Sequence, residues 1–585
     1  MSDAQAPNPK HLRTLAILLL LGLTFLATLA VSSTLWDRDE ARFARAAVEM
    51  LESDDYLVPT FNDNIRPDKP AGIYWAMVAG IQLLGETEIA VRLPSIFGLL
   101  WAATATYFAA FWITNQKRAA VIAFIILLTA IMPIVMGTLS TADGLLLGCL
   151  TQAYATFVHR AVRGPAWWHP PMLLLALTAG QLTKGPIGLA IPMANIILAG
   201  WLIGRAQRDD WRLGKRFWLS LWIIAALSFA AFLAWAIPAN TQSQGVLLDI
   251  GLGTHVLDRM VTPQEGHGGS NTLEYLALIP FYVPVLLIGL LPWTAIFPSA
   301  FNALRRREFL NGRDRALIWA WLIPTFITMS LVATKLPHYI LPIFPGLAVL
   351  IGAFVNQTAQ KPPRADTRFA RAGRAIFFLL IASLGLTLLI APYALSLTDL
   401  AWRTALPAAI LLLGIPWVLI NLAQRRLLEI TSIFATVTPI FILISASTLL
   451  PWVEHRLKIS PEIAEAIKLK LPEEATIYTL GYREPSVIYY LSRPLGYPVQ
   501  RMQRTREALL AWAASPRPTR QALIISTKEA QRLNVTPEDL GVISAGSKDF
   551  WNYSSDDEGR ALTIEVWILP SNAPKHPANH NATNP

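Results

Sequence analysis

The sequence contains a single cysteine, Cys149, among 585 residues. One cysteine cannot close a disulfide within the chain, and it excludes a cysteine-rich metal site such as a zinc finger. Charged residues are also scarce, at 15% of the chain, whereas hydrophobic residues make up 54%. This composition excludes a disordered polypeptide and argues against a soluble multidomain enzyme, because the surplus of apolar side chains needs lipid to face.

Glycine-rich nucleotide-binding motifs are missing as well. No Walker loop and no dinucleotide-binding fingerprint follows a predicted strand, which argues against a nucleotide-driven machine. The net charge of +10 could attract nucleic acid, but the basic residues do not cluster on one soluble face. We therefore expect no nucleic-acid partner.

Long apolar runs are what the sequence has instead. Runs of about 17 to 25 residues are long enough to cross a bilayer as helices. They predict a multi-spanning α-helical membrane protein whose first helix is retained rather than cleaved as a signal peptide. The thirteen expected spans are 14 to 35, 89 to 113, 119 to 136, 142 to 160, 167 to 183, 187 to 204, 217 to 237, 277 to 298, 316 to 333, 338 to 355, 374 to 395, 404 to 421 and 431 to 450.

The distribution of lysine and arginine predicts the orientation of these spans. With a cytoplasmic N-terminus, the cytoplasmic segments contain 23 of these residues, and the opposite loops before the final domain contain 9. A fourteenth crossing at 71 to 85 would reverse this asymmetry, so we expect that stretch at the membrane surface. The odd number of crossings then places the C-terminal region outside, in the periplasm if the membrane is a bacterial inner membrane.

Three domains follow from this reading. Residues 1–454 form the transmembrane domain, with outer loops at 36–88 and 238–276. Residues 455–572 form a small periplasmic α/β domain, and residues 573–585 form a disordered tail. In the α/β domain the pattern predicts strands at 475 to 482, 522 to 526 and 561 to 569, and helices at 485 to 493 and 503 to 513.

The first outer loop, 36–88, departs most from its surroundings, with 11 acidic and 5 basic residues. Its opening run leads into an amphipathic helix expected over 44 to 51. One interpretation is a solvated loop with ion pairs among Asp39, Arg42 and Arg45. The other is a general base or electrostatic stabiliser at the outer mouth of a cavity, because carboxylates at the end of a span are costly unless paired or used.

Lysines and carboxylates also occur at other outer ends of spans. Two prolines hold Lys69 in a rigid turn, where its ammonium could bind a phosphate or reach lipid headgroups. Taken together, these groups predict phosphate binding and acid-base chemistry on one side of the membrane. The further residues are Asp143, Lys184, Lys335, His338 and Tyr339.

The outer loop 238–276 contains the histidines His255 and His267, with Asp258, Arg259 and Glu265 nearby. Two histidines with neighbouring acids could bind zinc, although their spacing is not a recognised zinc signature. The alternative is a pair of surface histidines.

These residues resemble a family, the lipid-linked-sugar glycosyltransferases of GT-C type that include bacterial aminoarabinose transferases and the protein O-mannosyltransferase-like group. The order, spacing and predicted sidedness of the motifs carry the resemblance, over residues 36 to 345. The motifs are Trp36-x-x-Asp39-Glu40-x-Arg42-Phe43, Glu49-Met50-Leu51, Asp68-Lys69-Pro70, Ala90-x-Arg92-Leu93-Pro94, Thr183-Lys184-Gly185-Pro186 and Lys335-Leu336-Pro337-His338-Tyr339-x-Leu341-Pro342.

The resemblance implies roles for individual residues. Asp39 is the expected catalytic carboxylate, and Lys69, Lys184, Arg259 and Lys335 are the expected ligands of the lipid phosphate. The residues expected to position the acceptor or the sugar are Glu40, Arg42, Asp143, His338 and Tyr339. Asp68 stands where the family often has a glutamate that binds a metal, so Asp68, His255 and His267 are the candidates for a divalent ion such as zinc.

The implied activity is inverting transfer of a sugar from a polyprenyl (undecaprenyl) phosphate to a periplasmic acceptor. The favoured acceptor is lipid A, with 4-amino-4-deoxy-L-arabinose as the sugar. Protein glycosylation of the O-mannosyltransferase kind is the alternative within the enzyme class. A secondary transporter is the alternative outside it, but a transporter is expected to place its charges near the bilayer midplane.

Overall fold

The computed structural model forms two compact units. The membrane unit consists of Met1–Ser33 and Ala46–Leu450, and the C-terminal unit consists of Thr34–Arg45 and Pro451–Pro585. Residues 34–45, at the start of the outer loop 36–88, thus belong to the same unit as the C-terminal α/β domain. The structure describes residues 9–206, 213–263, 268–269, 271–360, 367–471, 475–482, 484–492, 497–515, 520–552 and 560–570.

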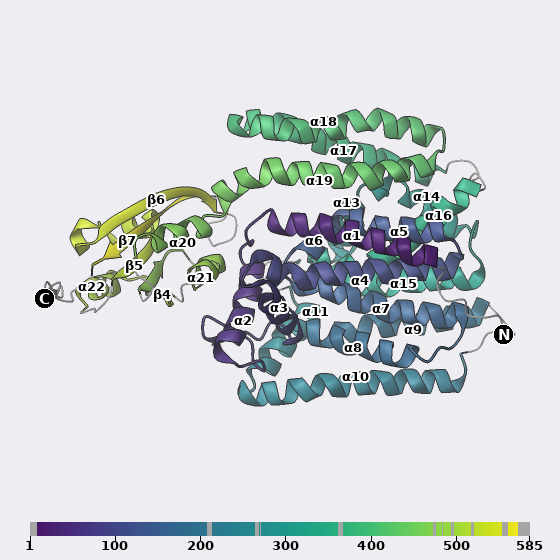
Figure 1. The fold of residues 1–585 in the computed structure, drawn as a ribbon, viewed down its shortest axis with the longest axis horizontal. Helices are drawn as coiled ribbons and strands as arrows, with labels where there is room; N and C mark the ends of the chain where they lie inside the picture. Colours follow the sequence, from purple (N-terminus) through teal and green to yellow (C-terminus); the bar gives the residue numbers. More distant parts are fainter. Residues whose placement is uncertain are drawn as a thin grey trace, which may run out of the picture. The chain divides into compact units, whose positions relative to one another are not determined.

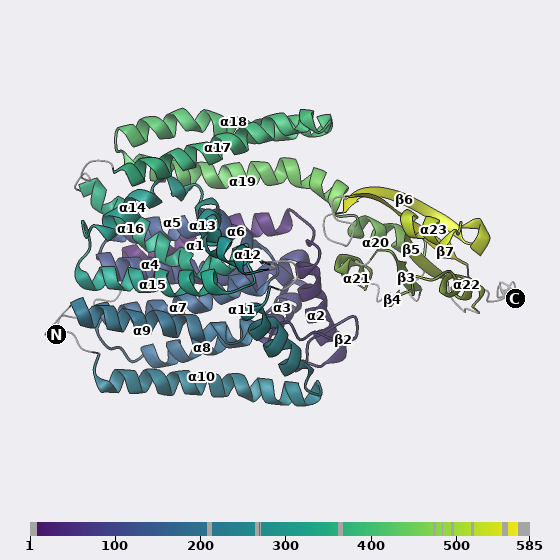
Figure 2. The same ribbon diagram turned by 180° about the vertical axis from the view of Figure 1, so that it is seen from behind.

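Helices make up nearly all of the membrane unit, and in Figures 1 and 2 the long ones run side by side. They are α1 (Pro9–Val31), α2 (Asp39–Ser53), α3 (Gly72–Leu84), α4 (Glu88–Thr114), α5 (Lys117–Thr129), α6 (Ile131–Thr138), α7 (Ala142–Arg163), α8 (His169–Lys184), α9 (Ile187–Ala206), α10 (Lys215–Gln242), η1 (Leu247–Asp258), α11 (Arg259–Val261), α12 (Thr272–Ala277), η2 (Ile279–Phe281), α13 (Tyr282–Gly289), η3 (Trp293–Ala295), α14 (Phe297–Arg305), α15 (Gly312–Leu331), η4 (Pro337–Ile343), α16 (Phe344–Gln360), α17 (Arg368–Ala394), α18 (Thr398–Ala423) and α19 (Leu427–Leu457).

Each of the thirteen apolar ranges overlaps helix, so the expected multi-spanning helical fold is confirmed. The range 277 to 298 is divided among η2, α13, η3 and the start of α14, and the helix long enough to span there is Thr272–Gly289. Among the described residues, nine helices are long and apolar enough to cross a membrane, or ten if the bent pair α5–α6 counts as one span. The other three ranges are occupied by α7, α8 and α15. Helix α3 has 13 residues and is about 20 Å long, too short for a hydrocarbon core of about 30 Å.

Small residues let these helices approach closely. On α7, Gly144 and Gly148 stand one turn apart and face Gly98 of α4, and a Cβ at Gly98 would lie 2.2 Å from the carbonyl oxygen of Gly144. Helices without a hydrophobic driving force between them associate through this kind of close backbone contact. It sets the position of the start of α7, where Asp143 lies.

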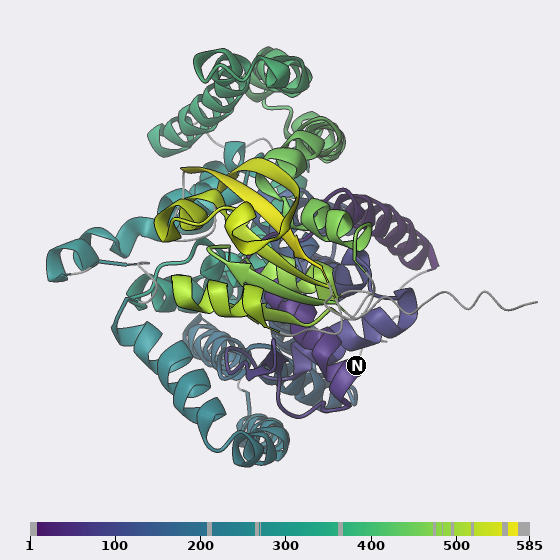
Figure 3. The ribbon, with the colours of Figure 1, turned by 90° about the vertical axis from the view of Figure 1, so that its left-hand side faces the viewer.

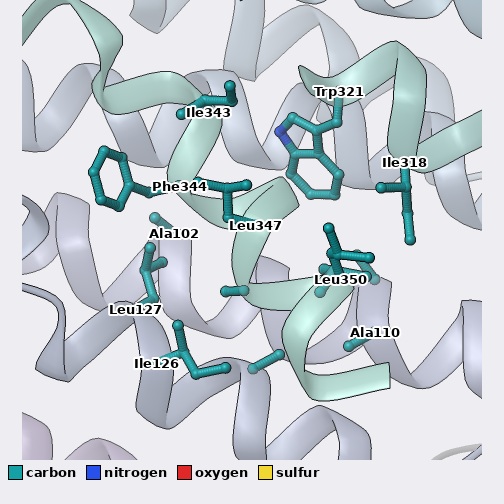
Figure 4. Close-up of a cluster of buried hydrophobic side chains, with 14 of the residues drawn as sticks. Ala102, Ala110, Ile126, Leu127, Ile318, Trp321, Ile343, Phe344, Leu347 and Leu350 are labelled. Atoms are coloured by element: carbon teal, nitrogen blue, oxygen red, sulfur yellow. The ribbon is translucent and has the colours of Figure 1, made fainter. Parts of the chain in front are cut away.

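Larger apolar side chains fill the space around this contact. Figure 4 shows Trp321 and Ile318 of α15 beside Leu347 and Leu350 of α16, with Leu127 of α5 across from them. By contrast, α17 and α18 leave many leucines and isoleucines exposed, as expected of helices that face lipid. The end-on view in Figure 3 shows these two helices and α10 at opposite edges of the membrane unit.

The C-terminal unit contains the expected α/β domain. Its five-stranded sheet has the order β4-β3-β5-β7-β6, with β4, β3 and β5 parallel and β7 and β6 antiparallel to their neighbours. The three expected strands are β3 (Thr476–Leu480), β5 (Gln521–Ser526) and β7 (Arg560–Leu569). The two expected helices are α21 (Pro485–Ser492) and α22 (Arg506–Ala514).

The sequence pattern missed the strands β4 (Val499–Arg501) and β6 (Ile543–Asn552) and the helices α20 (Ser460–Lys468) and α23 (Thr527–Leu533). The first strand has only three residues, and the second is interrupted by a bulge at Ser544/Gly546. Neither shows a clean alternation of apolar and polar residues. The tail expected at 573–585 lies outside the described residues.

Candidate functional site

A cavity of about 240 Å³ in the membrane unit, here called the cationic cavity, brings together seven of the residues singled out by sequence. They come from five separate stretches of the chain. Apolar side chains from α7, α9 and α15, such as Leu147, Ile187 and Met329, form the remaining wall. The seven residues are Asp68, Lys69, Asp143, Lys184, Arg259, His338 and Tyr339.

The turn that contains Lys69 is held in place by the preceding arginine. Arg66 is buried, and its Nε donates to Tyr74 Oη at 3.0 Å while its Nη1 lies 3.0 Å from Asp68 Oδ2. Lys69 Nζ donates to the carbonyl oxygen of Asp68 at 2.9 Å. A short hairpin, β1 (Thr60–Phe61) with β2 (Asn64–Ile65), leads into this turn. The lysine is therefore presented by a rigid segment rather than by a free loop.

Lys69 lies in an unfavourable environment for a cation. Burial, together with the nearby charges of Lys184, Arg259 and Arg66, lowers the pKa of its ammonium from the usual 10.5 to about 8, against the opposing effect of Asp68. Desolvation and like charges both disfavour the protonated form. An anion bound in the cavity would relieve this repulsion.

The start of α7, the end of α8 and the 3-10 helix η4 meet around Asp143. Its Oδ1 lies 2.5 Å from Lys184 Nζ at the end of α8, and its Oδ2 lies 3.9 Å from His338 Nε2 in η4. The close packing of α4 on α7 and of α3 on α8 fixes these ends, since a Cβ at Gly72 would lie 2.7 Å from the carbonyl oxygen of Leu182. Asp143 thus orients both a lysine and a histidine toward the cavity.

Tyr339 links the remaining cations. Arg259 Nη1 donates to Tyr339 Oη at 3.3 Å, and Lys184 Nζ lies 5.3 Å from the centroid of the Tyr339 ring. Fixed cations, Lys69, Lys184 and Arg259, outnumber the two carboxylates that line the cavity. A cavity with excess positive charge at one end and apolar walls suits an amphiphile with an anionic head.

Lys335 is not among the residues that line the cationic cavity. Its buried ammonium donates to the carbonyl oxygens of Met329 and Ser330, at 3.3 and 2.5 Å, and lies near the rings of Tyr275 and Tyr282. These carbonyls belong to the last turn of α15, where a cation is favoured by the helix dipole. The contacts give Lys335 partners outside the cavity, and its expected contact with a lipid phosphate stays a prediction.

The metal candidates are not brought together in the part of the chain that the structure describes. Asp68 is paired with Arg66 and stands beside Lys69. His267 and the side chain of His255 lie outside the described residues. Among the residues that are described, no three or more histidine, cysteine or acidic side chains form a metal-binding cluster. A carboxylate paired with a guanidinium is a poor cation ligand, so no catalytic step is assigned to a metal.

Asp39, Glu40 and Arg42 belong to the C-terminal unit. Asp39 is the first residue of α2 and is exposed, whereas Glu40 is buried and its Oε2 accepts a hydrogen bond from the backbone N–H of Trp36 at 2.9 Å. The backbone N–H of Arg42 donates to the carbonyl oxygen of Arg38. Glu40 therefore closes the first turn of α2, and Asp39 presents its carboxylate at the N-terminus of the helix.

A set of contacts ties residues 34–40 to the α/β domain. Lys458 Nζ donates to the carbonyl oxygen of Thr34 at 2.8 Å and lies 3.8 Å from the centroid of the Trp36 ring. The backbone N–H of Ser486 donates to Asp37 Oδ1 at 2.9 Å, and the backbone N–H of Leu35 donates to a tyrosine hydroxyl of α21. Burial raises the pKa of the Asp37 carboxyl, while Ser486 and Lys458 oppose this shift.

Sequence reasoning missed the supporting residues Arg66, Tyr74, Asp37, Ser486 and Lys458. An arginine two positions before the motif aspartate was an available signal for Arg66. Lys458 and Ser486 gave no local signal, because their partners lie more than 400 positions earlier in the chain.

Comparisons with known proteins find membrane glycosyltransferases among the similar proteins. The family described as dolichyl-phosphate-mannose-protein mannosyltransferase matches residues 68–235. An undecaprenyl phosphate-α-4-amino-4-deoxy-L-arabinose arabinosyl transferase of Edwardsiella ictaluri is 28% identical over 60% of this chain and 62% of that protein. The corresponding protein of Shewanella sediminis is 30% identical over 55% of this chain and 57% of its own. The chain thus aligns with about three fifths of the length of these curated relatives.

One solved structure is similar over almost the whole chain. ArnT from Cupriavidus metallidurans, in a crystal structure with undecaprenyl phosphate, matches with a TM-score of 0.70 and 19% identity. The match covers 94% of this chain and 97% of that one. The chain therefore has the fold of ArnT, and the resemblance to membrane glycosyltransferases that its motifs indicate is confirmed.

Proposed function

We propose that this protein transfers a sugar from a polyprenyl phosphate to an acceptor at the outer face of a bacterial inner membrane. The cationic cavity carries the proposal, because it combines three fixed cations with apolar walls in a protein with the ArnT fold. The proposed acceptor is lipid A and the proposed sugar is 4-amino-4-deoxy-L-arabinose. The names of the relatives favour this sugar and an undecaprenyl phosphate donor.

The proposed orientation follows the distribution of positive charge. A cytoplasmic N-terminus puts the lysine- and arginine-rich segments inside and the C-terminal α/β domain in the periplasm. The N-terminus of α7 and the C-terminus of α8, which contribute Asp143 and Lys184, then lie at the periplasmic end. Nucleotide sugars are made in the cytoplasm, so chemistry at this end needs a donor already carried across on a lipid.

In the proposed reaction an acceptor oxygen attacks the anomeric carbon and the bond from that carbon to the phosphate oxygen breaks. The electron pair of this bond leaves with the polyprenyl phosphate, which gains one negative charge. Lys69, Lys184 and Arg259 stabilise that charge as it develops, and this lowers the barrier. Attack opposite the leaving group inverts the configuration at the anomeric carbon.

Asp39 is the proposed catalytic carboxylate. A lipid A phosphate is already ionised, so Asp39 acts on it mainly by positioning, whereas a protein hydroxyl acceptor needs it as a general base. Glu40, Arg42, His338 and Tyr339 position the acceptor or the sugar. Asp143 keeps Lys184 in place and limits the net positive charge of the empty site.

The test is transfer of labelled sugar by the purified protein reconstituted in lipid. We expect label to move from undecaprenyl phosphate-aminoarabinose to lipid A, and Asp39→Asn to abolish transfer while the protein stays folded and inserted. Retained turnover in Asp39→Asn would exclude the assigned role. Movement of the intact donor across the bilayer without bond cleavage would instead identify a transporter.

Protein glycosylation is the second candidate, supported by the match of residues 68–235 to the protein mannosyltransferase family. Mass spectrometry of lipid A from cells with and without the gene separates the two. An added pentosamine that depends on the gene supports the favoured acceptor. Unchanged lipid A together with altered glycoproteins would establish the second candidate.

A further inference from the structure

A second cavity, also of about 240 Å³, lies at the opposite end of the membrane unit from the cationic cavity. Helix α8 connects the two: Lys184 at its C-terminus lines the cationic cavity, and His169 at its N-terminus lines the second one. The helix has 16 residues, so the two sites are separated by about 24 Å. The second cavity is therefore independent of the proposed transfer chemistry.

Two arginines give this cavity its charge. Arg160 lies near the end of α7, with its guanidinium carbon 5.7 Å from the centroid of the Phe217 ring, and Arg216 lies in the first turn of α10. Within the described part of the chain, neither guanidinium lies within 4.0 Å of a carboxylate. No carboxylate is among the described residues that line the cavity, and two cations that share it repel each other and favour an anionic ligand.

The histidine in the cavity does not add to this charge. The backbone N–H of Ala166 donates to His169 Nδ1 at 3.1 Å, so Nδ1 carries no proton and the ring is neutral. His169 Nε2 then carries the proton and donates to His159 Nδ1 at 2.9 Å. This chain of hydrogen bonds fixes the wall of the cavity beside the two arginines.

The rest of the cavity suits a hydrocarbon chain. Its walls are apolar, with Leu173 of α8, Ile196 of α9 and Ile224 of α10 among them. Helix α10 exposes much of its apolar surface, including Trp222 at 56%. Trp167, 87% exposed, lies in the loop next to the cavity, and exposed tryptophans of this kind mark the level of the lipid headgroups.

We infer that the second cavity binds an anionic phospholipid, with the phosphate between Arg160 and Arg216 and an acyl chain along α10. Basic pockets between membrane helices bind such headgroups. A free phosphate is also negatively charged, but it has no acyl chain to contact the apolar walls of the cavity. The inference does not depend on the proposed function, and it predicts selectivity for phosphatidylglycerol over zwitterionic phosphatidylcholine.

The experiment is native mass spectrometry of the full-length protein in a neutral detergent with equal amounts of the two lipids. We expect the protein to retain phosphatidylglycerol at least about tenfold better than phosphatidylcholine. Both lipids have a phosphate, but only phosphatidylcholine has a quaternary ammonium, which the two arginines would repel. The double variant Arg160→Gln/Arg216→Gln should lose about tenfold in phosphatidylglycerol retention. Arg163→Gln/Lys215→Gln removes the same charge from neighbouring positions outside the cavity and should behave as wild type.

Equal retention by the Arg160→Gln/Arg216→Gln variant and wild type would overturn the inference. So would complete displacement of phosphatidylglycerol by millimolar inorganic phosphate, because the apolar walls would then contribute nothing. Unfolding temperatures of the lipid-free variants serve as the folding control. If the double variant is unstable, Arg160→Gln and Arg216→Gln are measured singly, and each must lower retention on its own.

Discussion

At the scale of single residues, lysines of the same motif class occupy different environments. Lys69 and Lys184 line the cationic cavity, whereas Lys335 is buried against the last turn of α15. The sequence placed all three at outer ends of spans and could not separate them, because the motifs around them look alike. What separates them in the structure is the cationic cavity, which Lys69 and Lys184 line and Lys335 does not.

The first prediction concerns the pH dependence of Lys69. Its pKa of about 8 means that the ammonium is charged below this pH and loses its proton above it. The phosphodiester of the donor keeps one negative charge near and above pH 8. The affinity for the donor should therefore be highest below pH 8 and should decrease as the pH rises through 8. Lys69→Arg should abolish that fall, because arginine stays protonated.

Binding of undecaprenyl phosphate-sugar between pH 7 and 9.5 measures this effect. Lys69→Met should weaken transfer by about 100-fold at pH 7, the size of effect seen when one charge-stabilising donor is removed. A fall in affinity that persists in Lys69→Arg would place the titrating group elsewhere.

The second prediction separates the lysines. Lys335→Met leaves two carbonyl oxygens of α15 without their donor and should destabilise the protein by about 1–3 kcal/mol while the folded enzyme keeps its turnover. Lys184→Met should abolish turnover even in protein that remains folded, and it should also lower the unfolding temperature because it leaves the Asp143 carboxylate without its ammonium partner. Thermal unfolding in detergent and transfer assays on the same preparations give both quantities. Loss of turnover without loss of stability in Lys335→Met would assign that lysine to the site.

At the scale of elements, glycines bring backbone segments together around the cationic cavity. The clearest case is η1, where a Cβ at Gly251 would lie 2.6 Å from the carbonyl oxygen of Pro67, just before Asp68 and Lys69. The π-helix therefore packs directly on the turn that presents the lysine. This contact joins residues far apart in sequence, so no local pattern could reveal it.

The third prediction uses this contact. Gly251→Ala should displace the Pro67 turn and lower turnover by at least about tenfold, because small misplacements in a site cost one to two orders of magnitude. Gly253→Ala is the matched control in the same element, since its added Cβ would meet nothing closer than 3.8 Å. Equal activities in the two variants would show that the packing of η1 does not position Lys69.

The fourth prediction concerns the anchoring of residues 34–40 by α/β-domain residues. Lys458→Met removes the hydrogen bond to Thr34 and the contact with the Trp36 ring, and Lys458→Arg keeps the charge. We expect Lys458→Met to lower kcat by about tenfold or more with little change in the donor KM, because the donor phosphate binds elsewhere. Lys458→Arg should recover part of the loss. An unchanged kcat in Lys458→Met would show that the anchor is only structural.

At the scale of the whole molecule, the sequence predicted the helices and strands better than the tertiary contacts between them. Long apolar runs identify membrane helices because the bilayer demands a minimum length, and every expected range overlaps helix. Proline-containing motifs singled out Lys69 and Lys184, which both line the cationic cavity, because proline fixes the backbone locally. The grouping of residues 34–45 with the C-terminal unit, and the roles of Arg66 and Lys458, depend on tertiary contacts that a single sequence does not display.

That grouping affects the order in which the protein can mature. Leu35 and its partner Tyr490 are separated by 455 residues, and a ribosome that adds about 5–20 residues per second needs on the order of 20–90 s to make that stretch. During this time the membrane helices can insert one after another. Residues 34–37, which precede Asp39, cannot form their contacts with the α/β domain until that domain has been made. A nascent chain halted before Ser486 and Tyr490 would be inserted yet inert, so activity should begin only after this part of the α/β domain has been made.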